Sequence, residues 1–239
     1  MAPQPIIKLL TSSGIGSRRQ LTALIKRGSI AINGEIVQNL TEPVDPANDI
    51  ITIDGKHTSV TAEPLVYLML NKPKGVISST SDKRGEKTVI DFLPAKYQHI
   101  RLYPVGRLDK DSTGLILLTN DGELTFRLTH PRFEREKEYW VRIEQNLKPE
   151  DKMKLQNGIH LDDGKTSPAR VKSFKHPPFS YVITIHEGKK RQVRRMFASL
   201  GYKVLELKRI RFDSLRLGNL PEGKIREVTP RQVQSLKKG

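Results

Sequence analysis

The chain has 239 residues, with 42 lysines and arginines against 26 aspartates and glutamates, which gives a formal charge of +16. It has no cysteine, which excludes a disulfide framework and a thiolate metal site. Its six histidines are scattered, no apolar run approaches a membrane span, and the first residues lack the layout of a secretory signal, so we expect a cytoplasmic protein without a metal centre.

The positive charge is concentrated at the two ends of the chain. Residues 1–34 contain five basic residues and no acidic one, and residues 165–239 contain 19 basic and 5 acidic residues, a net charge of +14. Residues 61–164 are nearly neutral, with 17 basic and 16 acidic residues. Basic regions attract polyanions because neutralised phosphates release their counterions. The distribution favours a nucleic-acid partner over a merely basic, solvated surface.

Residues 4–56 have the pattern of a small separate module. Two short helices are predicted first, and Ser17 is a suitable N-cap for the second, which ends near Arg27. Asn33-Gly34 is a strong signal for a two-residue hairpin turn, and one further short strand follows it. The predicted order is therefore helix, helix, strand and hairpin.

This order resembles the S4 RNA-binding domain. The matching segments are Gly-Ile-Gly-Ser-Arg-Arg at 14–19, Leu-Ile-Lys-Arg-Gly at 24–28 and Ile-Asn-Gly at 32–34. Charge alone would favour a solvated helix face, and the ordered motif favours RNA binding instead. The resemblance implies that the basic residues of the two helices face RNA: Lys8, Arg18, Arg19, Lys26 and Arg27.

The rest of the chain has the pattern of one larger α+β domain. Residues 57–64 are polar and end at a proline, so they are predicted to be a linker before a domain at 65–239. Strands are predicted at 65–70, 102–105, 114–119, 139–143, 169–174, 181–186 and 204–207. Short helices are predicted at 88–93, 123–129, 191–200 and 231–236.

The segment at 106–122 carries the clearest candidate for chemistry. Asp109 and Asp111 lie in a polar turn before a buried strand, among Arg107 and Lys110. A carboxylate on a loop held by rigid strands can act as a nucleophile or a base. Aspartates before Ser-Thr-Gly are also ordinary turn residues that bond their own backbone. The residues alone favour the turn.

The whole segment resembles the catalytic-loop motif of pseudouridine synthases, in the branch that includes the ribosomal small-subunit enzyme A and the large-subunit enzymes B, E and F. The shared pattern is Gly-Arg-Leu-Asp, a few polar residues, Gly-Leu, an apolar strand and Thr-Asn-Asp-Gly, and every part of it is present. The resemblance implies that Asp109 is the essential aspartate, that Arg107 binds substrate, and that Asp111 is at a variable position.

Two later segments fit the same family. Lys-Glu-Tyr-Trp-Val at 137–141 matches a strand that supplies an active-site tyrosine, here Tyr139, although a core tyrosine is the commoner role. Trp140 is expected to point to the opposite face and pack there. Glu-Gly-Lys-Lys-Arg-Gln-Val-Arg-Arg at 187–195 matches a segment whose arginine, here Arg194, pairs with the aspartate, while Val193 contacts the base. Its other cations are expected to hold phosphates: Lys189, Lys190, Arg191 and Arg195.

A turn at 71–75, Asn-Lys-Pro-Lys-Gly, also matches the family. Its lysines could reach RNA, and a structural turn is an equally good interpretation. Among the members of the branch, residues 68–75 and 185–197 are most similar to those of enzyme B, which acts on the large ribosomal subunit.

The resemblance implies a small S4-like α/β module joined to an α+β catalytic domain with a mixed, mainly antiparallel sheet. It implies isomerisation of uridine to pseudouridine in ribosomal RNA without a cofactor, with Asp109, Tyr139 and Arg194 meeting in a basic cleft. The 23S rRNA is the favoured partner, and the 16S rRNA is the alternative. No membrane and no obligate protein partner are expected. Two other classes remain open, a non-catalytic RNA-binding or ribosome-assembly protein and an aspartate-dependent hydrolase.

Overall fold

The first compact unit of the structure, a computed structural model that describes residues 3–82 and 84–238, comprises the chain up to Leu65 together with His99–Arg101. Its helices are α1 (Ile6–Ser12) and α2 (Arg18–Lys26). One sheet has the order β3 (Glu35–Ile36), β2 (Ile30–Ile32), β5 (Ile51–Ile53) and β6 (Lys56–His57). A second, two-stranded sheet pairs β1 (Gln4–Pro5) with β4 (Pro43–Val44). The predicted helix, helix and hairpin order is confirmed, and β6 extends the module beyond the expected boundary at residue 56.

Local sequence explains why this unit folds as it does. The Ser17 hydroxyl accepts a hydrogen bond from the Gln20 amide (3.2 Å), and the Gln20 side chain accepts one from the Ser17 amide (2.9 Å), which caps α2 at both donors. The β2–β3 turn places Asn33 and Gly34 at φ 52° and 89°, as its sequence predicts. The apolar faces of both helices and the inner residues of the strands form one buried core.

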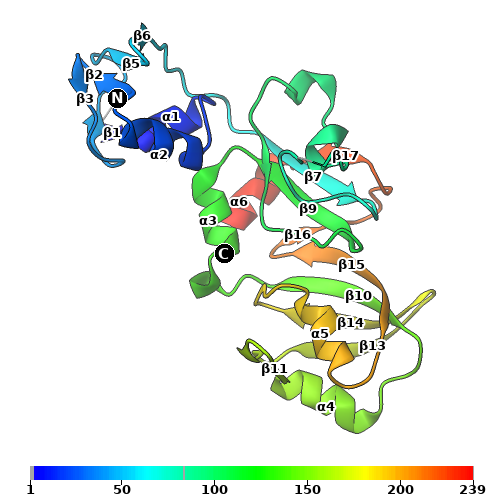
Figure 1. Cartoon of the computed structure of the whole chain (residues 1–239). Coiled ribbons are helices and arrows are strands. Elements are labelled where there is room, and N and C mark those ends of the chain that lie inside the picture. The colour runs from blue at the N-terminus through cyan, green and yellow to red at the C-terminus, as the bar shows by residue number, and fades with distance from the viewer. Residues whose placement is uncertain (1–2, 83, 239) are drawn as a thin grey trace. The chain divides into compact units, whose positions relative to one another are not determined.

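The second unit is built on a nine-stranded sheet (Figure 1). Its main path has the order β13 (Arg170–His176), β14 (Phe179–Ile185), β10 (Lys137–Ile143), β15 (Val204–Phe212), β9 (Thr113–Thr119), β7 (Tyr67–Lys72) and β17 (Ile225–Glu227). Two short strands pair beside it, β8 (Tyr103–Pro104) with β9 and β16 (Leu215–Arg216) with β15. Every pairing is antiparallel except that of β15 with β9, which confirms the mixed, mainly antiparallel sheet.

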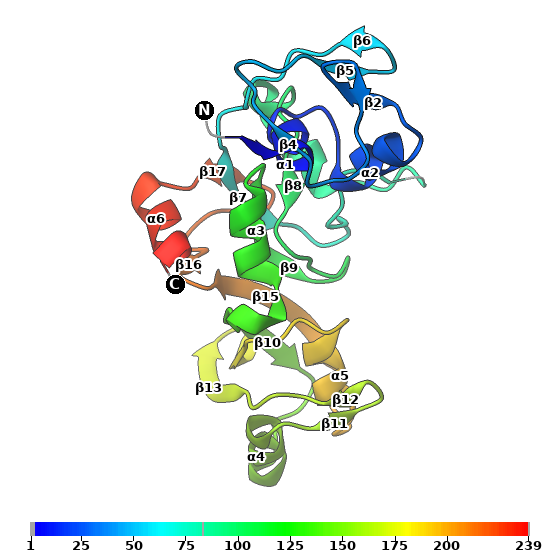
Figure 2. The same cartoon turned by 90° about the vertical axis from the view of Figure 1, so that its left-hand side faces the viewer.

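The parallel pairing divides the sheet into two halves. Only Lys208 with Thr113 and Arg209 with Gly114 are paired between β15 and β9. The half with β9 and β7 packs against α3 (Gly122–Thr129) and α6 (Pro230–Lys238), which Figure 2 shows on one side of β9. Their shared core is formed by buried apolar side chains that include Leu115 and Leu117.

The other half is covered by helices α4 (Pro149–Asn157) and α5 (Gln192–Ala198), and Figure 1 shows α5 against its strands. A small hairpin, β11 (His160–Leu161) with β12 (Gly164–Lys165), follows α4. Three short 3-10 helices complete the secondary structure of the described residues: η1 (Val89–Phe92), η2 (Ala95–Tyr97) and η3 (Pro131–Phe133). Among the described residues, no helix is long and apolar enough to span a membrane.

Candidate active site

The loop between β8 and β9 holds Asp109 at the junction of the two halves of the sheet. The Ser112 amide donates to the Asp109 carbonyl (3.1 Å). One residue earlier, the Leu108 amide donates to the Ser78 hydroxyl (3.0 Å), which itself donates to the Leu108 carbonyl (2.9 Å). The backbone on both sides of Asp109 is therefore fixed, while its side chain remains 29% exposed and accessible to a ligand.

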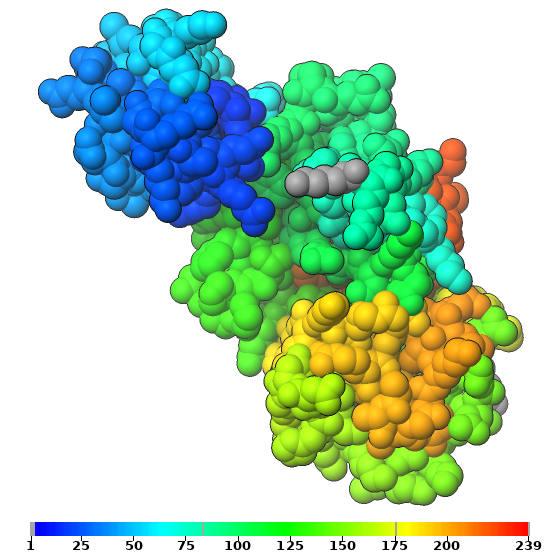
Figure 3. Space-filling view, in the orientation of Figure 1, coloured from blue at the N-terminus to red at the C-terminus, as the bar shows by residue number. Residues whose placement is uncertain are grey.

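Two arginines converge on this loop from residues 187–195, which lead into and begin α5 and are called the α5 segment below. Arg191 binds Asp111 with two hydrogen bonds of 2.9 and 3.0 Å, and its Nη1 lies 4.0 Å from the Asp109 carboxylate. Arg194 donates to the Asp111 carbonyl (3.0 Å) and to the Val204 carbonyl (2.8 Å). In Figure 3 the green residues around 110 meet the orange residues around 190. The predicted proximity of the aspartate loop and the arginine helix is present in the structure.

The detailed pairing differs from the expectation. Arg194 forms its ion pair with Asp111, at 3.3 Å from Nε to Oδ2, and Arg191 is the cation within 4.0 Å of Asp109. Arg191 is at φ 50°, a left-handed conformation that is costly for an arginine, and it is the N-cap residue of α5. Asp111, at the position that the motif leaves variable, is the anion that organises both arginines.

The electrostatics of Asp111 follow from these contacts. Hydrogen bonds from Arg191, followed by the charge of Arg194, hold the pKa of the Asp111 carboxyl below its usual value. The pKa of Arg194 is lowered by burial of its guanidinium. Asp111 is therefore a permanent anion at neutral pH and a structural partner, while Asp109 is left without a hydrogen-bonded cation among the described residues.

Asp111→Asn is expected to lower kcat about tenfold, because it removes a charge-assisted pair of about 1.5–3 kcal/mol and frees Arg191 to close on Asp109. Single-turnover measurements of the uridine isomerisation that the sequence motifs imply would test this. Asp163→Asn is a matched control, since it breaks another two-bond pair, with Arg195, away from Asp109. An unchanged kcat, or a loss equal to that of an Asp109 variant, would contradict the assigned role.

Tyr139 belongs to a row of directly paired residues that crosses the sheet. Backbone register pairs Lys72 with Gly114, Gly114 with Arg209, Arg209 with Tyr139 and Tyr139 with Ile183. Directly paired residues point to the same face of a sheet, about 4.8 Å apart per strand. Tyr139, 8% exposed, therefore lies on the face of Gly114 and Arg209, two strands from the strand that begins just after the Asp109 loop.

Two buried cations in this row are functional candidates that the sequence pattern did not identify. Arg209 is 2% exposed and its Nε donates to the Leu115 carbonyl (2.7 Å), beyond the point where the β15–β9 pairing ends. Lys72 is fully buried and donates to the carbonyls of Ser112 (2.7 Å) and Pro73 (2.9 Å). Lys72 thus supports the Asp109 loop, in line with the structural interpretation of the turn at 71–75, while Lys74 of the same turn is exposed.

Lys72 also gives the protein a predicted pH dependence. Burial lowers its pKa to about 8, and burial likewise lowers the pKa of Lys137, which donates to the carbonyls of Arg135 and His186, to about 8. Between about pH 8 and 10 the folded chain has released protons that the unfolded chain still holds, so the free energy of unfolding rises with pH. Above about pH 10 the rise ends, because the two lysines lose their protons in the unfolded chain as well. Burial raises the pKa of Tyr67 to about 12, so ionisation of this tyrosine in the unfolded chain then lowers the free energy of unfolding.

Lys72→Met should remove about half of that rise, and Lys137→Met the other half. Urea unfolding at about pH 7.5, 8.5 and 9.5 measures the slope for each variant. A slope that is identical in the wild type and in both variants would show that neither lysine releases its proton in this range.

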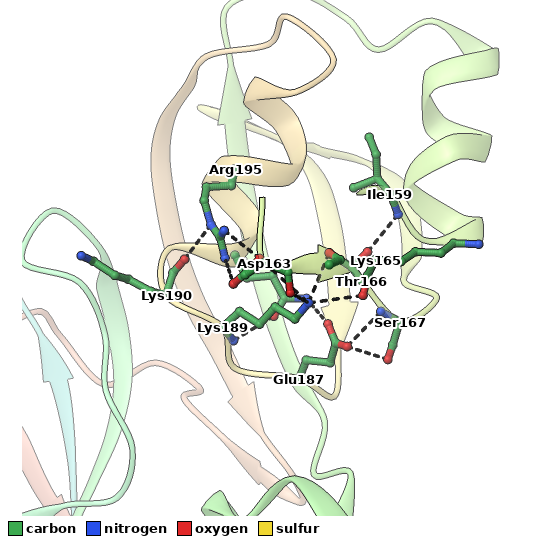
Figure 4. Close-up of polar contacts among 11 residues, drawn as sticks. Ile159, Asp163, Lys165, Thr166, Ser167, Glu187, Lys189, Lys190 and Arg195 are labelled. Atoms are coloured by element: carbon green, nitrogen blue, oxygen red, sulfur yellow. Dashed lines mark hydrogen bonds and ion pairs between the residues drawn. The ribbon is translucent and has the colours of Figure 1, made fainter. Parts of the chain in front are cut away.

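Two of the remaining cations of the α5 segment, Lys189 and Arg195, are engaged within the chain. Figure 4 shows Lys189 and Arg195 directed at the β11–β12 hairpin. The Lys189 ammonium lies 3.3–3.4 Å from the carbonyls of residues 163–165, and Arg195 binds Asp163 with bonds of 2.8 and 2.9 Å. Lys190 is exposed, as is Arg107. Contact of Lys189, Arg191 or Arg195 with RNA phosphates would require exchange of these partners, whereas Lys190 and Arg107 are directly accessible.

The basic residues of the first unit are all on its surface. Lys8 lies on α1, Arg18, Arg19 and Lys26 lie on α2, Arg27 is the C-cap of α2, and each is exposed. Arg27 pairs with Asp54 at 3.2 Å. Val193, in contrast, is buried on α5. Within the described part of the chain, no three His, Asp or Glu side chains are grouped to hold a metal ion.

A surface hollow of about 590 Å³ lies elsewhere, between α4 and the end of α5. Its lining includes Met153, Asn157 and Leu200. None of Asp109, Tyr139 and Arg194 lines it. The candidate site is therefore defined by the carboxylate–arginine cluster and the row across the sheet, and not by this hollow.

A mixed sheet divided at an aspartate loop, with an arginine-bearing helix beside that loop, is the arrangement that the sequence motifs implied for an RNA-modifying isomerase. The chain belongs to the RNA pseudouridylate synthase family, whose model matches residues 66–199, and an S4 domain model matches residues 4–51. It is 42% identical over 235 residues to the ribosomal large subunit pseudouridine synthase B of Bacillus subtilis (strain 168), covering 96% of this chain and 94% of that protein.

A second relative and a solved structure support the same family assignment. The protein of the same name from Vibrio cholerae serotype O1 is 37% identical over 239 residues, covering 96% of this chain and 73% of the relative. A solved structure described as a pseudouridylate synthase superposes with a TM-score of 0.70 at 32% identity, covering 97% of this chain and 99% of that one. The predicted class of enzyme, fold and family are thereby confirmed.

Proposed function

We propose that the protein isomerises specific uridines of large-subunit ribosomal RNA, with Asp109 as the reacting carboxylate. The observation that carries the proposal is the accessible Asp109 side chain on a backbone fixed at Leu108 and Ser112, beside two arginines anchored by Asp111. Support for the large-subunit substrate comes from the full-length similarity to two enzymes named for it.

The reaction breaks the N1–C1′ glycosidic bond, turns the uracil and joins its C5 to C1′; the C5 proton leaves, and N1 takes up a proton. A single carboxylate suffices, by attack on C1′ of the sugar or C6 of the base, or by removal of a sugar proton. In this proposal Arg191 and Arg194 orient the loop, and the Tyr139 ring packs against the uracil that has been turned out of its stack. Turning the base out costs a few kcal/mol, which phosphate contacts to the basic surfaces offset.

Release of tritium from [5-³H]uridine-labelled rRNA tests the proposal, because the C5 proton is lost only when the new bond forms. Purified enzyme is incubated with 23S and 16S rRNA from cells that lack the protein. Release from the 23S rRNA alone is expected. Release from the 16S rRNA alone would replace the substrate by the 16S alternative. Tight binding of both RNAs without release would favour a non-catalytic RNA-binding protein.

A further inference from the structure

The face of the sheet opposite Tyr139 carries a cluster of four aromatic side chains. The Trp140 ring lies 5.0 Å from Phe174, 4.9 Å from His176 and 5.5 Å from Phe179, measured between ring centroids, and the planes are tilted relative to one another. None of the four is buried, and His176 is exposed. The cluster spans β13, β14 and β10.

Alternation of burial shows that this face is open. Along β10, Tyr139, Val141 and Ile143 are buried under the helices, while Glu138, Trp140 and Arg142 are partly exposed. Large aromatic side chains gathered on an open sheet face are unusual, since such groups are normally removed from water. A partly exposed group of this kind is consistent with a surface that a partner covers.

Two lysines flank the rings in one row across four strands. Register pairs Lys172 with Val182, Val182 with Trp140, and Trp140 with Lys208, so these side chains point to the same face. The Lys208 ammonium lies 5.9 Å from the centre of the Trp140 ring. In the part of the chain that the structure describes, neither lysine forms an ion pair.

The arginines on this face of the same strands differ from these lysines, because glutamates neutralise them. Arg142 pairs with Glu206 (2.6 Å), and Arg211 pairs with Glu136 (3.0 Å). Among the residues of this face whose side chains the structure describes, the charge left over is therefore the pair of lysines on either side of the rings. Partly exposed rings between unpaired cations form the chemistry with which proteins bind single-stranded nucleic acid, by stacking bases and contacting phosphates.

We propose that this surface, the Trp140 face, formed by Trp140, Phe174, His176, Phe179, Lys172 and Lys208, binds a single-stranded segment of the RNA substrate. Bases stack on the rings, and the two lysines contact the flanking phosphates. The face lies on the reverse of the sheet from Tyr139, so the bound segment flanks the target uridine and does not contain it. The inference rests on the proposed function in one respect, that the ligand is RNA.

The chain's single tryptophan makes the test direct, because Trp140 is the sole source of indole fluorescence. An oligoadenylate of about 12 nucleotides, within the site sizes common for single-strand binding, has no uridine to occupy the active site and is titrated into the full-length protein. Saturable quenching is expected, together with protection of Trp140 from acrylamide. The Lys172→Glu/Lys208→Glu variant should bind more weakly, and its plot of log affinity against log salt should be shallower by about 1.4, at about 0.7 per phosphate contact.

Lys148→Glu/Lys238→Glu, with the same change in charge at exposed positions away from this face, is the matched control and should retain the quenching. Oligoadenylate binding that leaves the Trp140 emission unchanged, or quenching that persists in the Lys172/Lys208 variant, would overturn the proposal even if tritium release from rRNA continues. If the Trp140 emission does not change when RNA is added but shifts when purified large-subunit ribosomal proteins are added, the face would be assigned to a protein partner instead. Failure of both RNA binding and tritium release would overturn this inference and the proposed function together.

Discussion

Asp109→Asn is expected to abolish pseudouridine formation, lowering kcat at least about a thousandfold, because the amide can neither attack the nucleotide nor accept a proton. The change keeps the size of the side chain, and the backbone bonds at Leu108 and Ser112 do not involve the carboxylate. Folding and RNA affinity should therefore change little. Tritium release measures the first effect, and filter binding with rRNA measures the second.

Asp162→Asn is the control for this experiment, since Asp162 is an exposed aspartate on the β11–β12 hairpin and does not contact the loop. It should retain full activity. Turnover by Asp109→Asn within about tenfold of the wild type would remove Asp109 from the chemistry. Lost activity together with lost RNA binding would indicate unfolding, and thermal denaturation of the variant would reveal it.

Gly114→Ala is expected to destabilise the second unit by about 3 kcal/mol or more, because the added carbon cannot be accommodated. A Cβ at Gly114 would lie 2.2 Å from the Arg209 carbonyl oxygen and 2.7 Å from the Arg209 nitrogen. Both are backbone atoms of the strand that joins the halves of the sheet, so relief requires separation of β9 from β15 beside the Asp109 loop.

Gly75→Ala separates this clash from the conformational cost of an alanine at positive φ. Gly75 has φ +85° against +102° at Gly114, and a Cβ there would meet nothing within 4 Å. It should lose only about 1 kcal/mol. Chemical denaturation of both variants measures the difference. Equal stabilities would show that the close approach of the two strands is not required.

The elements that followed a clear pattern in the sequence were predictable. Ser17 and its helix, the Asn33-Gly34 turn and the apolar strand before Asn120 lie where local chemistry placed them. Helix α4 was missed, because beyond Leu155 and Met153 it has almost no apolar residues and so no periodic stripe. Strand β15 proved longer than expected at 204–207, because its cations at 208, 209 and 211 interrupt the apolar pattern while remaining within the sheet.

The residues of the candidate site were predictable, but the pairing of their side chains was not. The motif at 106–122 placed Asp109 on a loop, and the α5 segment was expected to face it. That Asp111 binds both arginines could not be predicted, because residues 111, 191 and 194 are far apart in the sequence and their side-chain contacts leave no pattern in it. The buried Lys72 and Arg209 were missed because a cation in a strand predicts exposure unless its partners are known, and these partners are carbonyls from distant segments.

Mapping of every pseudouridine in the rRNA of cells that lack the protein is the most direct test of the central claim, that Asp109 isomerises uridine in large-subunit rRNA. The expected result is loss of modification at one or a few positions of the 23S rRNA, restored by the wild-type gene and not by the Asp109→Asn gene. Unchanged modification throughout both rRNAs, or restoration by the Asp109→Asn gene, would contradict it.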